Sequence, residues 1–239
     1  MSADPSAIDG LGTILGVWAH PDDEAYLMAG TAMRAMDRGV RVTCVTATAG
    51  EAGETADEER WPQARLAEIR RQEMADSLAV LGIDDHEWLH LPDGALASID
   101  PQHGVDLVTA AIDRVRPDTI LTFGPDGMTG HPDHVTVGEW ATRAVAESGV
   151  DISMLAATKI QAWYDEFPAV TAEVFPDGGP CAAPGELVAE IEIGGEYLDR
   201  KVRALGAQAS QTAGLVDLMG AANYRTWNAV EYWVDITPA

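Results

Sequence analysis

TILGVWAHPDDE, residues 13–24, joins an apolar run to a dense cluster of imidazole and carboxylate groups. The run Thr13–Ala19 is typical of a buried strand, and the acidic residues after it are favoured in the first turn of a helix. A second cluster, His131-Pro132-Asp133-His134, also follows an apolar run, Asp118–Phe123. These two junctions between a strand and a cluster predict both the fold and the position of a site.

Strands and helices are predicted to alternate along the chain. The predicted strands are Thr13–Ala19, Val40–Ala47, Glu87–Leu91, Asp118–Phe123 and Thr158–Trp163, with a weaker candidate at Val188–Ile193. The predicted helices are Glu24–Arg38, Pro62–Leu81, Val105–Val115, His134–Ala146 and Glu196–Gln208. This alternation predicts a Rossmann-like α/β fold of three layers, in which helices cover both faces of a mostly parallel sheet. We expect one domain over residues 1–239, with a catalytic core at about 11–165 and a C-terminal extension at about 166–239.

Charge and composition restrict the kind of partner. The formal net charge of −24 disfavours binding to nucleic acid or to an anionic membrane surface, because phosphate contacts need clustered Lys and Arg. No signal peptide is visible, and no apolar stretch of about 18 residues could span a bilayer. We therefore expect a cytoplasmic protein that acts on a small molecule. Its oligomeric state is open, and a homo-oligomer is one alternative.

The two clusters are predicted to meet across one crevice. In doubly wound sheets, ligands bind at the carboxyl ends of the strands where the strand order reverses, commonly between the first and fourth strands. Helix capping alone would account for Asp22, Asp23 and Glu24. It does not explain why three of the six histidines of the chain lie at these two points. We therefore favour a catalytic site.

A His-Asp-His set within the clusters suits a catalytic metal ion. His20 and Asp23 are three residues apart and can face the same side of a turn, and His134 would complete the set from across the crevice. Zn²⁺ is the expected ion and Fe²⁺ the alternative, because a set of two histidines and one carboxylate suits either metal. Spacing alone does not decide which carboxylate binds the metal and which acts as a base.

The other polar groups of the clusters suggest catalytic roles. Asp22 lies beside a ligand but would point elsewhere, so it is the natural general base. His131 would stabilise an oxyanion or protonate a departing amine. Asp133 would hold one of the histidines by a hydrogen bond.

Six short motifs follow one another between about residues 11 and 146. They are AHPDDE at 19–24, GEAG at 50–53, RRQE at 70–73, LPDG at 91–94, TFGPDG at 122–127 and HPDH at 131–134. In this order they resemble the signature of the PIG-L/LmbE-like superfamily of zinc-dependent N-acetylglucosaminyl de-N-acetylases. That superfamily includes the mycothiol and bacillithiol deacetylases and a mycothiol S-conjugate amidase.

The resemblance implies roles for the matching residues. The implied zinc ligands are His20, Asp23 and His134. The implied catalytic residues are Asp22 as base, His131 at the tetrahedral intermediate, and Asp133 turned toward His131. Arg70 and Asp93 fall where the sugar deacetylases contact substrate. The alternatives are an exposed helix position for Arg70 and a turn position for Asp93.

Two positions depart from the family pattern. Thr129 stands where the mycothiol deacetylases carry a tyrosine, and Gln208 stands where a histidine is common. We expect a metal-dependent hydrolase that removes an acetyl group from an N-acetylated amino sugar or sugar conjugate. One alternative is an amidase that cleaves a larger thiol-conjugate amide. Another, of a different class, is a non-catalytic metal-binding module.

Overall fold

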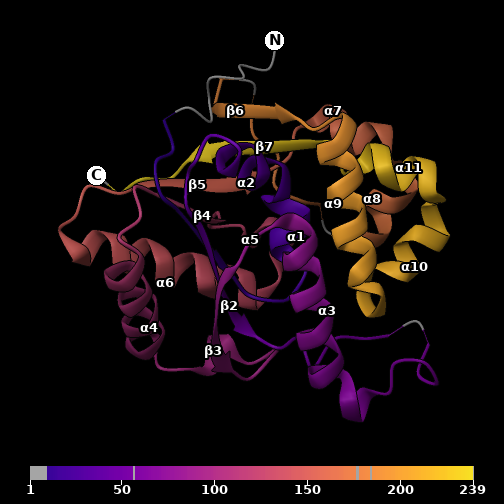
Figure 1. Ribbon diagram of the computed structural model, residues 1–239, viewed down its shortest axis with the longest axis horizontal. Coiled ribbons are helices and arrows are strands. Elements are labelled where there is room, and N and C mark those ends of the chain that lie inside the picture. The colour runs from indigo at the N-terminus through magenta and orange to yellow at the C-terminus, as the bar shows by residue number, and fades with distance from the viewer. Residues whose placement is uncertain (1–9, 56, 176–177, 184, 239) are drawn as a thin grey trace.

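A seven-stranded sheet forms the centre of the computed structural model, which describes residues 10–55, 57–175, 178–183 and 185–238 (Figure 1). The two ends of the predicted domain, and residues 176, 177 and 184 of its C-terminal extension, lie outside the described residues. The strands are β1 (Ile14–Trp18), β2 (Val42–Thr48), β3 (Asp85–Leu91), β4 (Thr119–Phe123), β5 (Ser153–Thr158), β6 (Leu187–Glu192) and β7 (Val230–Asp235).

The strand order is β3-β2-β1-β4-β5-β7-β6. Strands β1 to β5 run parallel, whereas β7 is antiparallel to both β5 and β6. The sheet is therefore mostly parallel, as predicted. Because β1 pairs with both β2 and β4, the order reverses between β1 and β4, where the sequence predicts the crevice.

Two groups of helices cover the sheet and complete the three predicted layers. On one face α4 (Pro101–Val115) packs against α6 (Pro132–Ser148). On the other face α9 (Gly195–Ala207) packs against α1 (Asp23–Leu27), α2 (Ala29–Met36) and α3 (Leu66–Leu81). The remaining helices at the edge of this layer are α7 (Gln161–Glu166), α8 (Pro168–Val174), α10 (Ala209–Met219) and α11 (Ala221–Trp227), which gather at one end of the molecule (Figure 1). The short α5 (Gly127–Gly130) leads into α6.

Burial explains why the central strands were readable from the sequence. Every residue of β1, β2 and β4 is buried. Strands covered by helices on both faces carry nearly continuous apolar runs instead of an alternating pattern. Below the site, the rings of Trp18 and Phe123 meet edge to face at 5.1 Å and join the ends of β1 and β4.

Two predicted elements differ from the structure, and one strand was not predicted. The fifth strand is Ser153–Thr158, so the predicted strand at 158–163 begins where the real one ends. Residues 161–163 instead open α7. The predicted helix at 24–38 is divided at Met28, whose backbone leaves the helical region with φ −126° and ψ 0°. Strand β7 was not predicted.

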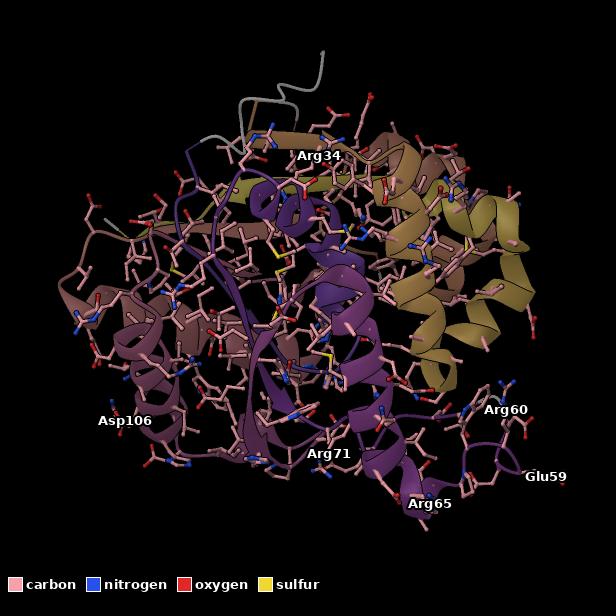
Figure 2. All side chains as sticks on the ribbon, in the orientation of Figure 1. Arg34, Glu59, Arg60, Arg65, Arg71 and Asp106 are labelled. Atoms are coloured by element: carbon pink, nitrogen blue, oxygen red, sulfur yellow. The ribbon has the colours of Figure 1, made fainter. Side chains whose placement is uncertain are left out.

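Several charged side chains lie at the periphery of the molecule. Arg60 and Arg65, in the segment before α3, extend away from the sheet (Figure 2). Residues 52 and 53 of the same segment line the main cavity, so this part of the segment borders the site. No helix in the described ranges is both long enough and apolar enough to cross a membrane.

Candidate metal and active site

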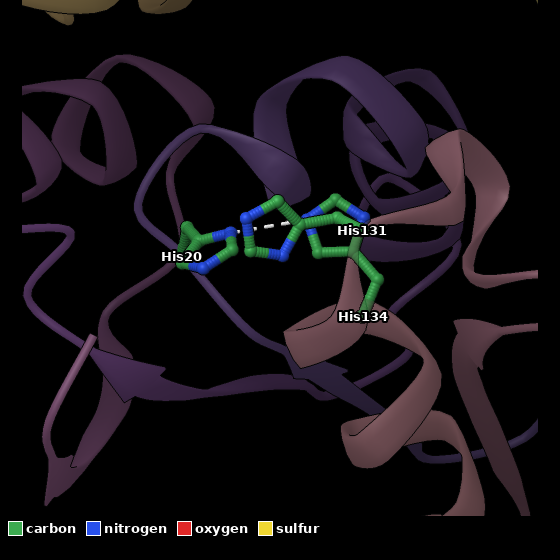
Figure 3. Close-up of side chains that lie close together, drawn as sticks. All are labelled: His20, His131 and His134. Carbon is green, nitrogen blue, oxygen red and sulfur yellow. Dashed lines mark hydrogen bonds between the residues drawn. The ribbon is translucent and has the colours of Figure 1, made fainter. Parts of the chain in front are cut away.

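The two sequence clusters meet at the carboxyl ends of β1 and β4. His20 follows β1, and His134 lies in the first turn of α6, which follows β4. The Nδ1 atom of His20 lies 3.0 Å from Nε2 of His134. Figure 3 shows these two rings and that of His131 as one cluster, with the contact between His20 and His134 dashed.

The Asp23 carboxylate completes a convergent set of donors. Its Oδ1 lies 3.4 Å from Nε2 of His134, and its Oδ2 lies 3.9 Å from Nδ1 of His20. The same Oδ2 accepts a hydrogen bond of 2.8 Å from the backbone N–H of His20, which fixes the carboxylate. Nitrogen atoms of His20, His131 and His134 also lie within 4.8 Å of one another, so His131 borders the same point.

The proton positions on His134 fit a metal ligand. Its Nδ1 lies 2.9 Å from the carbonyl oxygen of Gly127, so Nδ1 carries the proton and Nε2 presents a lone pair. Burial lowers the pKa of His134 to about 4, which keeps the ring neutral. That lone pair faces a second imidazole nitrogen and a carboxylate, an arrangement that a divalent cation could bridge. The donor set therefore fits a divalent metal ion.

The far side of the His20 ring is held by two carboxylates. Its Nε2 lies 3.0 Å from Oδ1 of Asp93 and 3.5 Å from Oδ2 of Asp133. Burial opposes protonation, but these two carboxylates and Asp23 outweigh it and raise the pKa of His20 to about 10. A carboxylate that accepts from one ring nitrogen leaves the other nitrogen oriented toward a metal.

In this structure the carboxylates of Asp93 and Asp133 therefore contact His20 and backbone N–H groups of the protein itself. Asp93 also accepts the N–H of Ala52 at 2.7 Å. The carboxylate of Asp133 accepts the N–H groups of Gly94 at 2.8 Å and Leu96 at 3.0 Å. These amides turn it toward His20, whereas the resemblance implied that it would face His131.

His131 is oriented by its position at the start of α6. Its Nδ1 accepts the backbone N–H of Asp133 at 3.1 Å, so its side chain caps the helix. A neutral ring whose Nδ1 accepts carries its proton on Nε2. Burial and the charge of His20 lower the pKa of His131, which favours this neutral form. The side chain can therefore offer one N–H to an oxygen in the cavity.

Asp22 has a strained backbone. Its φ is 104°, a value that residues with a side chain rarely adopt outside functional sites. Its N–H donates to Oε2 of Glu24 at 3.0 Å, and its carbonyl accepts the N–H of Tyr26 at 2.9 Å. Burial raises the pKa of Asp22 to about 7, and the nearby Arg70 opposes that rise.

Arg70 is buried and bonds to the loops around Asp22. It is 4% exposed, which rules out an exposed helix position. Its Nη2 donates to the carbonyl of Pro21 at 2.6 Å and lies 3.5 Å from Oδ2 of Asp22, while Nη1 donates to the carbonyl of Gly50 at 2.8 Å. Arg70 borders the cavity, but its donors orient the chain around Asp22.

A cavity of about 330 Å³ opens beside these residues. One end is polar and is formed by residues of the two clusters, namely His20, Asp22, Asp23, His131 and His134. The remainder is largely aromatic and apolar, with Tyr26, Trp163, Phe175, Leu215 and Trp227 in its wall. A polar end beside an apolar wall is typical of small-molecule sites.

Sequence reasoning missed Lys159, Tyr26 and Asn228, which also line the cavity. Lys159 directly follows β5, so the rule that ligands bind at carboxyl ends of strands could have found it. Because the predicted strand covered residues 158–163, Lys159 was placed inside a strand instead of directly after one. Tyr26 and Asn228 carry no motif that could have identified them.

The fold and site define a class of Rossmann-like α/β proteins with an imidazole and carboxylate cluster at the switch point of the sheet. Within that class, the chain belongs to the PIG-L family of GlcNAc-PI de-N-acetylases, whose sequence model matches residues 15–145.

Three relatives illustrate the similarity. A 1D-myo-inositol 2-acetamido-2-deoxy-alpha-D-glucopyranoside deacetylase of Mycobacteroides abscessus is 32% identical over 82% of this chain and 80% of its own length. A probable N-acetyl-alpha-D-glucosaminyl L-malate deacetylase 2 of Bacillus cereus is 33% identical over 85% of this chain and 86% of its own length. A Kineococcus radiotolerans protein with the first of these names is 35% identical, and the match covers 58% of this chain and 46% of that protein.

Solved structures share the fold. N,N'-diacetylchitobiose deacetylase of Pyrococcus horikoshii aligns with a TM-score of 0.64 at 21% identity, over 98% of this chain and 90% of its own. The 4-carboxy-2-hydroxymuconate hydratase of Pseudomonas putida aligns with the same TM-score at 15% identity, over 96% of this chain and 98% of its own. Because a hydratase shares the architecture, the fold alone does not define the reaction.

Proposed function

We propose that the chain is a metal-dependent hydrolase that removes the acetyl group from an N-acetylated amino sugar or its conjugate. The observation that carries this proposal is the convergence of His20, Asp23 and His134 beside Asp22 at one end of a cavity. The relatives named as deacetylases of glucosamine-containing conjugates support the choice of reaction.

His20, Asp23 and His134 are the residues that would hold the metal ion. Zn²⁺ is our first assignment, and Fe²⁺ suits the same donor set. When bound, such an ion supplies Lewis acidity, which lowers the pKa of water and polarises an acyl carbonyl.

Asp22 is assigned as the general base. Its carboxylate takes a proton from the water that attacks the acetamide carbon, and the proton then passes to the amine as the C–N bond breaks. Burial raises its pKa to about 7, close to the value at which a base is both ionised and effective near neutral pH. Arg70 keeps the ionised form accessible, because its guanidinium lies 3.5 Å from Oδ2.

His131 and Asp133 complete the assignment. The Nε2–H of His131 is the donor to the oxygen that gains charge during attack, a role that preorganised hydrogen-bond donors commonly fill. The backbone N–H of Asp133 holds that ring, and its carboxylate supports His20. One residue thus orients both a catalytic imidazole and a metal-ligand imidazole.

The test is the Asp22→Asn variant, with methyl N-acetyl-α-D-glucosaminide and N-acetylglucosaminyl conjugates as substrates. We expect bound metal at the wild-type level and a turnover lower by about a thousandfold, measured as free amine. Wild-type turnover in the variant would contradict the role of Asp22. Cleavage of thiol-conjugate amides, without cleavage of N-acetylglucosaminides, would assign the chain to the amidases.

A further inference from the structure

Lys159 places a buried amine in the wall of the cavity. The side chain is 8% exposed and borders the same space as His131 and Trp163. Its Nζ lies 4.4 Å from the centre of the Trp163 ring and 5.8 Å from that of Tyr232. Across the described ranges, this Nζ makes ring contacts but neither a hydrogen bond nor an ion pair. Lys159 lines the cavity, and its Nζ is not fully enclosed.

Lys159 is paired with no carboxylate among the described residues. Burial lowers the pKa of Lys159 to about 7; the charge of Lys201 adds to this effect and that of Glu231 opposes it. Glu231 is already bonded to Lys201 at 2.7 Å and to two backbone N–H groups, those of Gly30 and Thr31. An uncompensated buried cation is costly. With 39 Asp and Glu side chains in the chain, a protein carboxylate could readily have been placed beside it.

We propose that Lys159 binds a carboxylate on the substituent attached to the amino sugar, so that the cavity selects an acidic glycoconjugate. This inference rests on the proposed function and adds a class of substrate to it. The polar end of the cavity holds Asp22 and Asp23, which repel an anion. Arg70 also borders the cavity, but its guanidinium is bonded to the carbonyls of Pro21 and Gly50 and lies beside Asp22. Lys159 has no such partner among the described residues and can therefore attract an anion.

The surroundings of Lys159 strengthen such a contact. Trp163, Phe175 and Trp227 form the apolar part of the wall, and an ion pair is stronger where water is excluded. These rings would also cover the carbon skeleton of the substituent. The relatives include a deacetylase named for a malate conjugate, which is acidic, and one named for an inositol conjugate, which is neutral. Lys159 favours the acidic kind.

The test compares two substrates that differ only in charge, N-acetyl-α-D-glucosaminyl L-malate and its dimethyl ester. We expect wild type to prefer the acid in kcat/KM. In Lys159→Met, which keeps the packing on Trp163, the ratio of acid to ester should fall by about tenfold to a hundredfold, the range expected for a hydrogen bond to a charged group. Lys159→Arg should retain most of the preference. Arg71→Met, which removes an exposed charge from α3, is the control and should leave the ratio unchanged.

A binding measurement separates this inference from the proposed function. Calorimetric titration of the holoenzyme with α-D-glucosaminyl L-malate and its dimethyl ester requires no turnover. We expect wild type to bind the acid at least about tenfold tighter, and Lys159→Met to lose that difference. If neither substrate is hydrolysed but this binding difference is found, the deacetylase assignment fails and the anion site stands. Equal binding of acid and ester by wild type would overturn the anion site.

Free acetate is the other source of a carboxylate, because the reaction releases it. Titration with acetate alone distinguishes the two sources. We expect Lys159→Met to bind acetate as wild type does. A loss of acetate binding in the variant, with an unchanged ratio of acid to ester, would assign Lys159 to the released product and overturn its role in substrate selection.

Discussion

The Nε2 atom of Gln208 donates a hydrogen bond of 2.7 Å to Oε1 of Glu24, and both side chains are buried. The other oxygen of Glu24 accepts the N–H of Asp22, whose backbone is strained. Burial raises the pKa of Glu24 to about 8, and Ser77 lies 3.4 Å from the same Oε1. A chain of polar contacts thus runs from the end of α9 to the assigned base, and it starts at a position where the family commonly has a histidine.

Gln208→Ala should therefore lower kcat by about tenfold while bound metal stays at the wild-type level. Without its donor, the Glu24 carboxylate is free to shift, and the backbone of Asp22 loses its fixed acceptor; an unsatisfied buried group costs about 1–3 kcal/mol. Steady-state kinetics and metal analysis check this expectation. Gln72→Ala is the control, because Gln72 is exposed and bonds only to Asp76 among the described residues. A loss of stability with unchanged kcat would make Gln208 a packing residue.

Replacement of His134 and of His131 should have different effects on metal content. His134→Ala should lose the metal ion, because Nε2 of His134 faces both His20 and Asp23. His131→Ala should retain the ion and lose turnover by about a hundredfold, the usual effect of removing one oxyanion donor. Metal stoichiometry after dialysis and amine release on the same samples provide the measurement. Metal loss in both variants would place His131 among the ligands, as its distances also allow.

The buried ion pair of Lys201 and Glu231 should respond unequally to the loss of either partner. Glu231 accepts from Lys201 and from three groups of Gly30 and Thr31. Lys201→Met leaves those three donors in place, so we expect the free energy of unfolding to fall by about 3 kcal/mol. Glu231→Ala removes the acceptor of all four donors. We therefore expect the free energy of unfolding to fall by about 5 kcal/mol, the upper end for a broken buried pair. Urea unfolding measures both.

A surface pair provides the matched control for that comparison. Arg225 and Asp199 lie 2.6 Å apart, but their side chains are 39% and 53% exposed. Arg225→Ala should cost less than about 1 kcal/mol, as exposed ion pairs generally do. Equal losses in Lys201→Met and Glu231→Ala would show that the backbone N–H groups contribute little to holding Glu231.

The stability effect of Lys159 should depend on pH. Its pKa is about 7 in the folded chain against 10.5 for a free lysine, so both states carry the proton below pH 7 and the burial cost is complete there. Between these values the unfolded chain binds more protons, so stability rises with pH, by at most about 1.4 kcal/mol per pH unit. Lys159→Met lacks this pH-dependent contribution to stability. Its gain in stability over wild type should be largest below pH 7 and should shrink toward pH 10.5.

Urea unfolding of both proteins without ligand, at about pH 6, 8 and 10, measures this difference. Arg71→Met serves as the reference, since an exposed arginine keeps its charge over this range. A difference between Lys159→Met and wild type that grows with pH would have the wrong sign and would reject a lowered pKa in the folded chain.

The parts of the fold that the sequence predicted are those whose signal is local. β1 and β4 are wholly buried apolar runs, and each is followed by an acidic turn. β7 escaped prediction because its buried face carries Glu231, and a charge in a strand normally indicates the solvent side. Its partner, Lys201, lies thirty residues earlier and is brought to it only by the tertiary fold.

The site shows the same division between local and long-range information. The composition of the two clusters predicted that His20, Asp23 and His134 would lie together, and they do. The partners of Arg70 could not be read from its helix, because Pro21 and Gly50 belong to two separate loops. The direction of the Asp133 carboxylate is likewise decided by amides of Gly94 and Leu96, which lie in the segment after β3.

Strand β7 lies between β5 and β6 in the sheet, although it follows both along the chain. During synthesis on the ribosome, the edge of β5 that faces β7 therefore lacks its partner strand until residues 230–235 have emerged. An unpaired edge on the sheet of β1 to β5 can form hydrogen bonds with strands of other nascent chains. Trp227 arrives in the same late stretch, so the cavity acquires part of its wall only then. The time that translation takes from β5 to β7 is thus the interval in which this edge of the sheet is exposed.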